Sequence, residues 1–281
     1  VNEYFNGNKE LVNLPRKYIV GISACSKHCM GHEIQDLSFS ATKFANGKVL
    51  FDVSVGGGLA SNKQFGMHIG FVEASQILDV VKSVSITYRD HGIRENRRKA
   101  RLGHLITKWG LEKFKEEIET KLGFSLQDGV TNNFTPYAKR EHFGIHKTKV
   151  DGISYIGCAV NGGSIKSQGL EDLANILEKH GATTIKTTTT QNFVIVDAPS
   201  DSANSIVEEL DTIGIDANPN PFKARTLSCT GMQFCKFGIS ETKDAAISLA
   251  GHLHSQFPDF EETVSISMNG CPNSCAHPSI V

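Results

Sequence analysis

The sequence contains no run of eighteen apolar residues, so no segment of it predicts a membrane-spanning helix. It also has almost no net charge, since 29 Lys and Arg stand against 30 Asp and Glu. This balance indicates neither nucleic acid nor a membrane surface as a partner. A Gly-x-Gly-x-x-Gly sequence is missing as well, and a dinucleotide-binding fold is therefore not indicated. The apolar share of 39% is typical of a globular protein.

Cysteine is present in an odd number, seven, and the residues are clustered rather than scattered. A secreted disulfide framework would favour an even number at regular spacing. The pattern therefore indicates metal chemistry in a reducing compartment and predicts a cytoplasmic location.

Four of the cysteines form two pairs near the C-terminus, Cys229-x5-Cys235 and Cys271-x3-Cys275, with 35 residues between the pairs. Four thiolates are what a [4Fe–4S] cluster or a structural zinc ion requires. Zinc sites favour closer pairs, and the Cys-x2-Cys-x2-Cys run of bacterial ferredoxins is absent. The spacing favours a cluster over zinc, and buried thiols without a metal are the third alternative.

The residues around these cysteines carry a resemblance to a known family. Cys229-Thr-Gly-Met-Gln-Phe-Cys235-Lys, Glu241-Thr-Lys243 and Asn269-Gly-Cys-Pro-Asn-Ser-Cys275 resemble the sirohaem and [4Fe–4S] signature of the ferredoxin-type nitrite and sulfite reductases. The resemblance extends through four earlier segments in the order of the family: Asn13-Leu-Pro-Arg-Lys17, His32-Glu-Ile-Gln-Asp36, Val55-Gly-Gly-Gly-Leu59 and Arg98-Lys-Ala-Arg101.

The resemblance implies both cofactors and the reaction. Cys229, Cys235, Cys271 and Cys275 would bind the [4Fe–4S] cluster, and Cys275 would also be the axial ligand of sirohaem. The implied activity is the reduction of nitrite to ammonia, or of sulfite to sulfide, with electrons from ferredoxin or a similar donor. The implied fold is α+β, with two related halves about a pseudo-twofold axis. A non-catalytic iron–sulfur or zinc protein, for electron transfer or binding, is the alternative.

Lys17 matches a substrate-facing lysine of the family and is the catalytic candidate; alone it would be taken for a surface lysine. Two residues later, sulfite reductases of the family carry a second lysine, whereas this chain has Ile19. Loss of a cation weakens the binding of the more highly charged sulfite more than the binding of nitrite, so this position mildly favours nitrite.

Three further groups are candidates for cofactor binding. Glycines after a strand can approach a flat ligand or line an anion site with backbone N–H groups, although a plain loop is the other interpretation. Arginines suit the carboxylates of sirohaem, although a charge run is usually a solvated face. A third segment resembles the Arg-x-Thr-x-x-Gln-Asn of the family, with lysine in place of arginine. The candidates are Gly56, Gly57 and Gly58; Arg98 and Arg101; and Lys186, Thr188, Gln191 and Asn192.

The pattern of apolar residues predicts the domain organisation. Residues 37–43 and 48–55 alternate around Asn46-Gly47 and predict a β-hairpin, and apolar stripes over residues 77–122 predict three helices. Residues 154–160, 170–180, 184–196 and 203–213 predict a β-α-β-α half of a ferredoxin-like sandwich. The predicted parts are a first sirohaem/cluster-type domain, a linker, the half-module and a cluster domain, over 1–124, 125–150, 151–217 and 218–281. The start of the last part, Asn218-Pro-Asn-Pro221, is predicted as a second linker.

A weak internal repeat links the two ends of the chain. Val20-Gly-Ile-Ser-Ala-Cys25-x3-Cys29 and Ile266-Ser-Met-Asn-Gly-Cys271-x3-Cys275 both read as a short strand before Cys-x3-Cys. The first pair is expected to be vestigial or structural, and a second metal site is the alternative. Members of the family begin upstream of Val1 and continue beyond Val281, so the sequence is expected to be an internal fragment that does not turn over alone.

Overall fold

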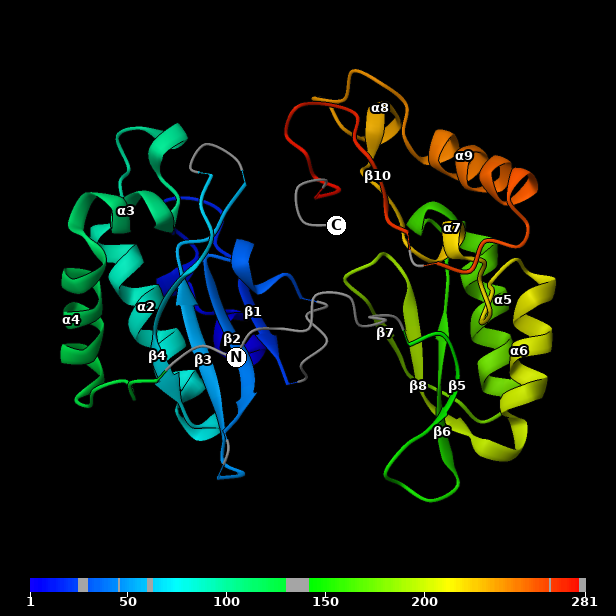
Figure 1. Ribbon diagram of the computed structural model, residues 1–281, viewed down its shortest axis with the longest axis horizontal. Coiled ribbons are helices and arrows are strands. Elements are labelled where there is room, and N and C mark those ends of the chain that lie inside the picture. Colours follow the sequence, from blue (N-terminus) through cyan, green and yellow to red (C-terminus); the bar gives the residue numbers. More distant parts are fainter. Residues whose placement is uncertain (25–29, 45, 60–62, 130–141, 263, 278–281) are drawn as a thin grey trace. The chain divides into compact units, whose positions relative to one another are not determined.

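The computed structural model describes residues 1–24, 30–44, 46–59, 63–129, 142–262 and 264–277. The chain forms two compact units, Val1–Ala138 and Lys139–Val281. Both units combine helices with a β-sheet, as expected for an α+β protein (Figure 1). The predicted division into four parts is not tested by this and stays a prediction.

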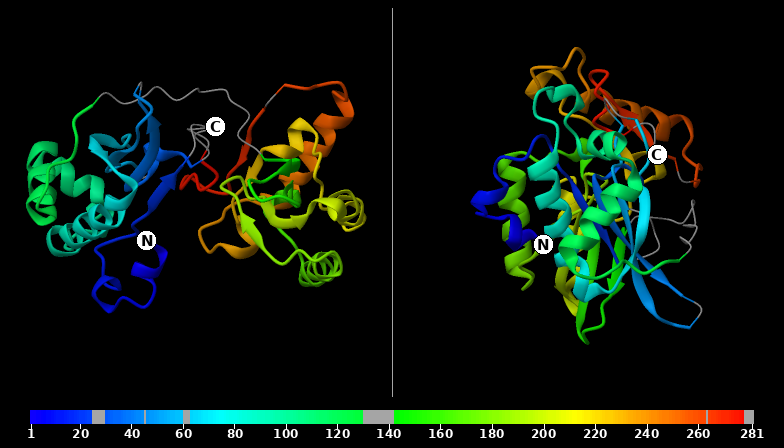
Figure 2. Two further views of the ribbon diagram at one scale, coloured as in Figure 1. Left: turned by 90° about the horizontal axis from the view of Figure 1, so that it is seen from below. Right: turned by 90° about the vertical axis from the view of Figure 1, so that its left-hand side faces the viewer.

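The first unit is a four-stranded sheet in the order β1-β2-β3-β4 with its long helices on one face (Figures 1 and 2). β1 is parallel to β2, and the other pairs are antiparallel. The predicted hairpin is present as β2 and β3, and Asn46 accepts a hydrogen bond from the Lys48 N–H in its turn. The elements of this unit are β1 (Val20–Ser23), β2 (Leu37–Lys43), β3 (Val49–Val55), β4 (Met67–Val72), α1 (Asn2–Phe5), α2 (Ile77–His91), α3 (Leu102–Trp109) and α4 (Leu111–Leu122).

The predicted helical stripes form the core of the first unit. α2, α3 and α4 bury their apolar faces against Phe39 and Val53 of the sheet. Tyr88 of α2 is fully buried, and its hydroxyl donates to the Ala100 carbonyl at 2.8 Å, so its polar end is satisfied. The three helices that the sequence predicts are therefore confirmed.

The second unit contains a four-stranded sheet in the order β5-β6-β8-β7, with α5 and α6 side by side on one face (Figure 1). The predicted strand over 184–196 is wrong in detail, because it is a hairpin of two strands. Thr188 accepts the Asn192 N–H with its hydroxyl, and Gln191 has a φ of 62°, which turns the chain. The elements are β5 (Gly144–Lys147), β6 (Ile153–Cys158), α5 (Ser167–Lys179), β7 (Ile185–Thr187), β8 (Phe193–Pro199) and α6 (Ala203–Thr212).

Two segments that the sequence predicts as linkers contain ordered elements. β5 lies inside the predicted linker 125–150, and its exposed side chains give no apolar alternation that would have revealed it. The second predicted linker, 218–221, begins the short helix α7 (Pro221–Ala224). Asn220 caps α7 with its side chain, and the buried Phe222 anchors it.

The C-terminal part of the second unit is built on two short parallel strands, β9 (Thr226–Ser228) and β10 (Ile266–Met268). Between them the chain forms α8 (Gly231–Phe234) and the long helix α9 (Lys243–Gln256). The two segments of the internal repeat thus both begin with a short strand that has a parallel neighbour. Cys25 and Cys29 lie outside the described residues.

Within the described ranges, no helix is both long and apolar enough to cross a bilayer. The cytoplasmic location stays a prediction.

Candidate functional site

The two cysteine loops, which we define as residues 229–240 and 269–276, start at the same end of the β9–β10 pair. Because the strands are parallel and Ser228 lies opposite Met268, both chains leave the pair in the same direction. The Cys229 N–H donates to the Met268 carbonyl at 3.0 Å and extends the pairing into the first loop. This topology brings cysteines that are far apart in the sequence to one edge of the unit.

Backbone N–H groups face the sulfur of Cys229. The Gly270 N–H donates to Cys229 Sγ at 3.2 Å, which ties the second loop to the first. Burial raises the pKa of the Cys229 thiol, but the N–H groups of Gly270 and Gly231, the neighbouring Thr242 hydroxyl and the charge of Lys243 together outweigh it, and the net pKa is lowered. N–H donors at a cysteine sulfur favour its thiolate form, and the thiolate is the form that binds the iron of an iron–sulfur centre.

Glycines allow the two cysteine loops to pack closely. Gly231 has a φ of +63°, and a Cβ there would lie 2.4 Å from Thr242 Oγ1. A Cβ on Gly238 would meet the backbone of Gly231 at 2.8 Å, and one on Gly270 would meet the Ser240 carbonyl at 3.0 Å. The glycines that accompany the cysteines in sequence are thus required by close backbone approach.

The four thiols do not themselves converge in this structure. Among the described residues, no three His, Cys, Asp or Glu side chains lie close enough together to hold a metal ion. Cys229, Cys235 and Cys271 are partly exposed, and Cys275 is exposed. Binding of a metal centre is coupled to closure of the loops that hold it. The two cysteine loops lie at one edge of the unit, and an N–H group of the second donates to a sulfur of the first. This arrangement fits a cluster whose binding draws the four thiolates together.

The first cysteine loop exposes several of its own large apolar side chains to solvent. Met232, Phe234, Phe237 and Ile239 are between 60% and 76% exposed, an unusual density of large apolar groups for a surface loop. The faces of a tetrapyrrole are apolar, and such side chains fit against one.

The segment around Gln191 contacts the strand that leads into the first cysteine loop. The Gln191 amide donates to the Ser228 carbonyl at 2.7 Å and accepts the Ser228 N–H at 3.0 Å, which continues the β9 pairing with a side chain. Asn192 accepts the Val160 N–H and donates to the Ala224 carbonyl. Gln191 thus binds the strand that leads into Cys229, and Asn192 binds the end of α7, just before that strand.

Lys186 and Thr188 occupy different positions around this hairpin. Lys186 is exposed on β7, whereas Thr188 closes the turn through its hydroxyl. Lys186, the only charged residue of the four candidates in this segment, therefore presents its ammonium group to solvent.

The three glycines after β3 are crowded by backbone. A Cβ on Gly57 would lie 2.3 Å from the Glu33 carbonyl oxygen. The N–H groups of Gly56, Gly57 and Gly58 donate to carbonyls of Asp36, Gln35 and Gln64 at 2.7–3.0 Å. These donors are occupied within the unit, so the close-approach interpretation of the glycines is favoured over an anion site made by their N–H groups.

We expect Gly57→Ala to lower the free energy of unfolding by about 1–3 kcal/mol, because the added methyl group must displace backbone rather than a side chain. Gly251→Ala is the matched control. Gly251 lies inside α9 with nothing within 4 Å of its Cβ position, so alanine there should stabilise by about 0.5–1 kcal/mol. Equal denaturation midpoints for the two variants would show that the glycine triplet is not crowded.

The basic run divides into exposed and paired arginines. Arg98 is exposed on the short 3-10 helix Arg97–Lys99. Arg101 instead binds Asp36 with two donors, at 2.9 Å to Oδ1 and 2.7 Å to Oδ2. Two of the donors that the sequence suggests for a cofactor carboxylate are thus used inside the protein. Lys17 is exposed, three residues before β1.

Comparison with known proteins identifies this combination of units. A family model described as the nitrite and sulphite reductase 4Fe-4S domain matches residues 1–126. A second, described as the nitrite/sulfite reductase ferredoxin-like half domain, matches residues 146–213. The chain belongs to the nitrite and sulfite reductase family. The α+β fold and the ferredoxin-like half-module expected from the sequence are thereby confirmed.

Curated relatives of this family include enzymes for both anions. The chain is 33% identical to "Sulfite reductase [ferredoxin] 1" of Mycolicibacterium paratuberculosis, over 96% of this chain and 49% of the relative. It is 30% identical to "Ferredoxin--nitrite reductase" of Synechococcus elongatus, over 98% and 54%. The chain therefore spans about half the length of the curated relatives that it matches.

A solved structure of the family shows the same fold. The structure of the Mycobacterium tuberculosis NirA protein matches with a TM-score of 0.86 and 32% sequence identity, over 98% of this chain and 50% of that one.

Two residues of the family signature acquire positions that the sequence did not assign. Thr242 is fully buried, and its hydroxyl donates to the Cys229 carbonyl at 2.7 Å. The Lys243 ammonium donates to the Gly162 carbonyl at 2.6 Å. Burial lowers the pKa of Lys243, and the charges of Cys229 and Glu241 act against this. Both residues could have been singled out from the sequence, because they belong to the Glu-Thr-Lys motif.

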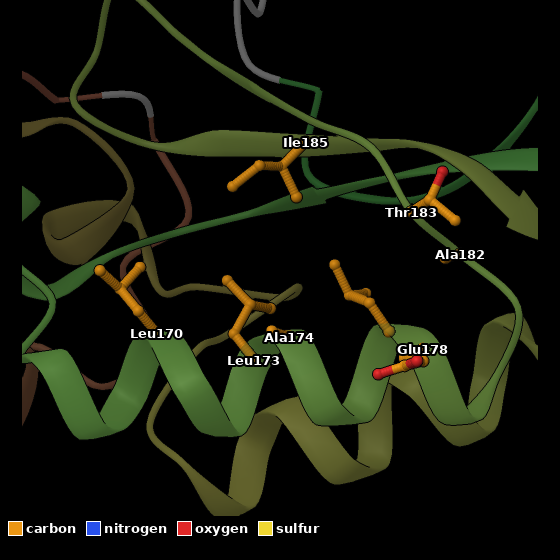
Figure 3. A pocket seen from close by; sticks show the side chains of 8 residues that line it. Leu170, Leu173, Ala174, Glu178, Ala182, Thr183 and Ile185 are labelled. Carbon is orange, nitrogen blue, oxygen red and sulfur yellow. The ribbon is translucent and has the colours of Figure 1, made fainter.

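An apolar groove of about 420 Å³ lies between α5 and β7, away from the cysteine loops. Figure 3 shows Leu170 and Leu173 of α5 on one side and Ile185 of β7 on the other. Glu178 is the one ionisable residue in its lining. The groove brings together none of the predicted site residues and offers no redox chemistry.

Cys158 contrasts with the cysteines of the loops. It is fully buried in β6, and burial raises the pKa of its thiol to about 12. We expect this thiol to resist iodoacetamide at pH 8 in the folded protein and to react after denaturation, because only the thiolate is nucleophilic. Mass spectrometry of peptides tests this; rapid labelling of Cys158 before unfolding would contradict the packing of β6.

Proposed function

We propose that the protein carrying this chain reduces nitrite to ammonia at a sirohaem coupled to a [4Fe–4S] cluster, with ferredoxin as the electron donor. Membership of the family supports the reaction class, and the names of the relatives support ferredoxin as donor. The observation that carries the proposal is the arrangement of the cysteine loops, which leave one parallel strand pair together and aim N–H groups at Cys229.

In this proposal Cys229, Cys235, Cys271 and Cys275 would hold the cluster, and Cys275 would also be a ligand of sirohaem. The two cofactors supply stored single electrons and a metal on which the anion is reduced. The remaining candidates act on the macrocycle in different ways. Gly56–Gly58 permit close approach, Arg98 and Lys186 present charge, and Thr188, Gln191 and Asn192 shape the segment before Cys229. The full-length protein is proposed to consist of two related halves about a pseudo-twofold axis.

Lys17 is proposed to bind the substrate anion. It is exposed, and its ammonium is a point charge with three donors, which suits a small oxyanion. Ile19 cannot add a second charge, so the singly charged nitrite is favoured. Sulfite reduction is the second candidate, favoured by the sulfite reductase named among the relatives.

Steady-state kinetics of the holoprotein with reduced ferredoxin test this proposal. We expect a higher kcat/KM for nitrite than for sulfite, together with the visible absorption bands of sirohaem. A holoprotein without sirohaem bands that reduces neither anion would contradict it and leave the non-catalytic electron-transfer role.

A further inference from the structure

Lys243 carries a half-buried ammonium group that is held by neutral oxygens. Its Nζ donates to the Gly162 carbonyl at 2.6 Å and lies 3.5 Å from the Ser228 hydroxyl. Among the described residues no acidic side chain forms an ion pair with it, and Glu241 affects its pKa only from a longer distance. An ammonium that is withdrawn from water without an acidic partner is costly. Such a group indicates another source of negative charge nearby.

The contacts of Lys243 place its charge at the start of the first cysteine loop. Ser228, beside which the ammonium lies, is fully buried and directly precedes Cys229. Thr242, the chain neighbour of Lys243, donates its hydroxyl to the Cys229 carbonyl at 2.7 Å, and this hydroxyl lies 4.0 Å from the Cys229 sulfur. Two consecutive residues where α9 begins thus contact two consecutive residues where β9 ends.

The half-module supplies the carbonyl that fixes the ammonium. Gly162 belongs to the 3-10 turn Asn161–Gly163, and its carbonyl accepts the Ser228 hydroxyl at 3.2 Å as well as Lys243. Gly162 has a φ of +57°, and a Cβ there would meet Ile247 of α9 at 3.2 Å, so the turn packs closely against that helix. The ammonium cannot turn away to solvent without breaking a charge-assisted hydrogen bond.

We propose that Lys243 is a positioning residue that holds one positive charge beside the Ser228–Cys229 step and so makes the iron–sulfur cluster easier to reduce. A cube with four thiolates is an anion, and the electron from the one-electron donor adds a further negative charge. Net charge is one of the determinants of a cluster's reduction potential. A fixed cation stabilises the reduced form more than the oxidised form, because the Coulomb energy grows with the charge of the anion. This inference rests on the proposed function, in which Cys229 binds the cluster.

Reductive titration of the holoprotein, followed through the electron paramagnetic resonance signal of the reduced cluster, tests this role. At the potential that half-reduces the original cluster, we expect the ratio of reduced to oxidised cluster to fall about threefold to tenfold in Lys243→Met. The methionine removes the charge and keeps a similar side-chain length. Lys243→Arg keeps the charge, and its ratio should stay within about twofold of the original. Lys179→Met is the matched control, because Lys179 is exposed and paired with Glu209 at 2.8 Å; its ratio should be unchanged.

Ser228→Ala separates the charge from the packing of the same contact. This variant removes the hydroxyl that shares the Gly162 carbonyl and leaves the ammonium in place. We expect its cluster to lose iron to a chelator several-fold faster, with a ratio of reduced to oxidised cluster within about twofold of the original. If Ser228→Ala lowers the ratio as much as Lys243→Met does, the effect comes from loosened packing and the role of the charge is refuted.

The remaining outcomes distinguish this inference from the proposed function. An unchanged ratio in Lys243→Met with intact cluster absorption would overturn the inference alone, and so would an equal fall in Lys243→Arg. A lowered ratio in a holoprotein that reduces neither anion would support the inference and refute the proposed reaction. A holoprotein without cluster iron would overturn both. If Lys243→Met is insoluble, Lys243→Gln decides the question by the same titration, because glutamine keeps a donor without the charge.

Discussion

Serine in place of Cys229 or Cys271 is expected to remove the iron–sulfur cluster from the holoprotein and to abolish reduction of the anion. A serine hydroxyl is a poor substitute for a thiolate on iron, and each loop contributes to the same centre in the proposed site. Cys229 also receives the Gly270 N–H that joins the two loops, so the substitution removes a ligand and a loop contact together. Iron and acid-labile sulfide analysis measures the loss.

Cys158→Ser is the control for these substitutions. Cys158 is buried in β6 of the second sheet and is not a member of either cysteine loop. This variant should retain its full iron and sulfide content, although burial of a hydroxyl will reduce stability. A cluster that survives in Cys229→Ser and Cys271→Ser would exclude these two residues as ligands.

Lys17→Met is expected to lower kcat/KM for the anion by roughly 10- to 150-fold. A hydrogen bond to a charged group contributes about 1.5–3 kcal/mol, and the methionine removes charge and donors while keeping a similar side-chain length. The visible spectrum should be unchanged, because Lys17 is assigned to the substrate and not to a cofactor. Steady-state kinetics with nitrite and sulfite measure the effect.

Lys43→Met provides a matched loss of charge. Lys43 is the exposed last residue of β2 and has no assigned role, so its replacement should leave kcat/KM unchanged. Similar losses in Lys17→Met and Lys43→Met would indicate a general electrostatic effect and not binding of the anion by Lys17.

The regular elements of the first unit could be predicted because their apolar residues follow one period. The alternation over β2 and β3 and the stripes of α2–α4 correspond to buried faces in the structure. The prediction failed where backbone hydrogen bonds, and not buried side chains, define the element. β5 has exposed side chains, and the turn between β7 and β8 depends on the Thr188 hydroxyl and on the positive φ of Gln191.

The candidate site could be predicted in composition but not in contacts. The cysteines and glycines of the loops are visible as a motif, and the parallel pairing of β9 with β10 explains how segments so far apart meet. The partner of Arg101 was not predictable, because Asp36 lies 65 residues away and its burial is a property of the packed unit. The contact of the Gln191 amide with the strand before Cys229 was likewise not predictable, because the two segments are 37 residues apart in the sequence.

The central claim is that both cysteine loops bind one iron–sulfur cube, and Mössbauer spectroscopy of the iron-57-enriched holoprotein tests it most directly. We expect the signature of a [4Fe–4S] cluster coupled to a haem iron, and we expect it to be lost in full when either Cys229 or Cys271 is replaced by serine. A spectrum with no cluster iron, or a cluster signature that persists when Cys229 or Cys271 is replaced by serine, would contradict this claim.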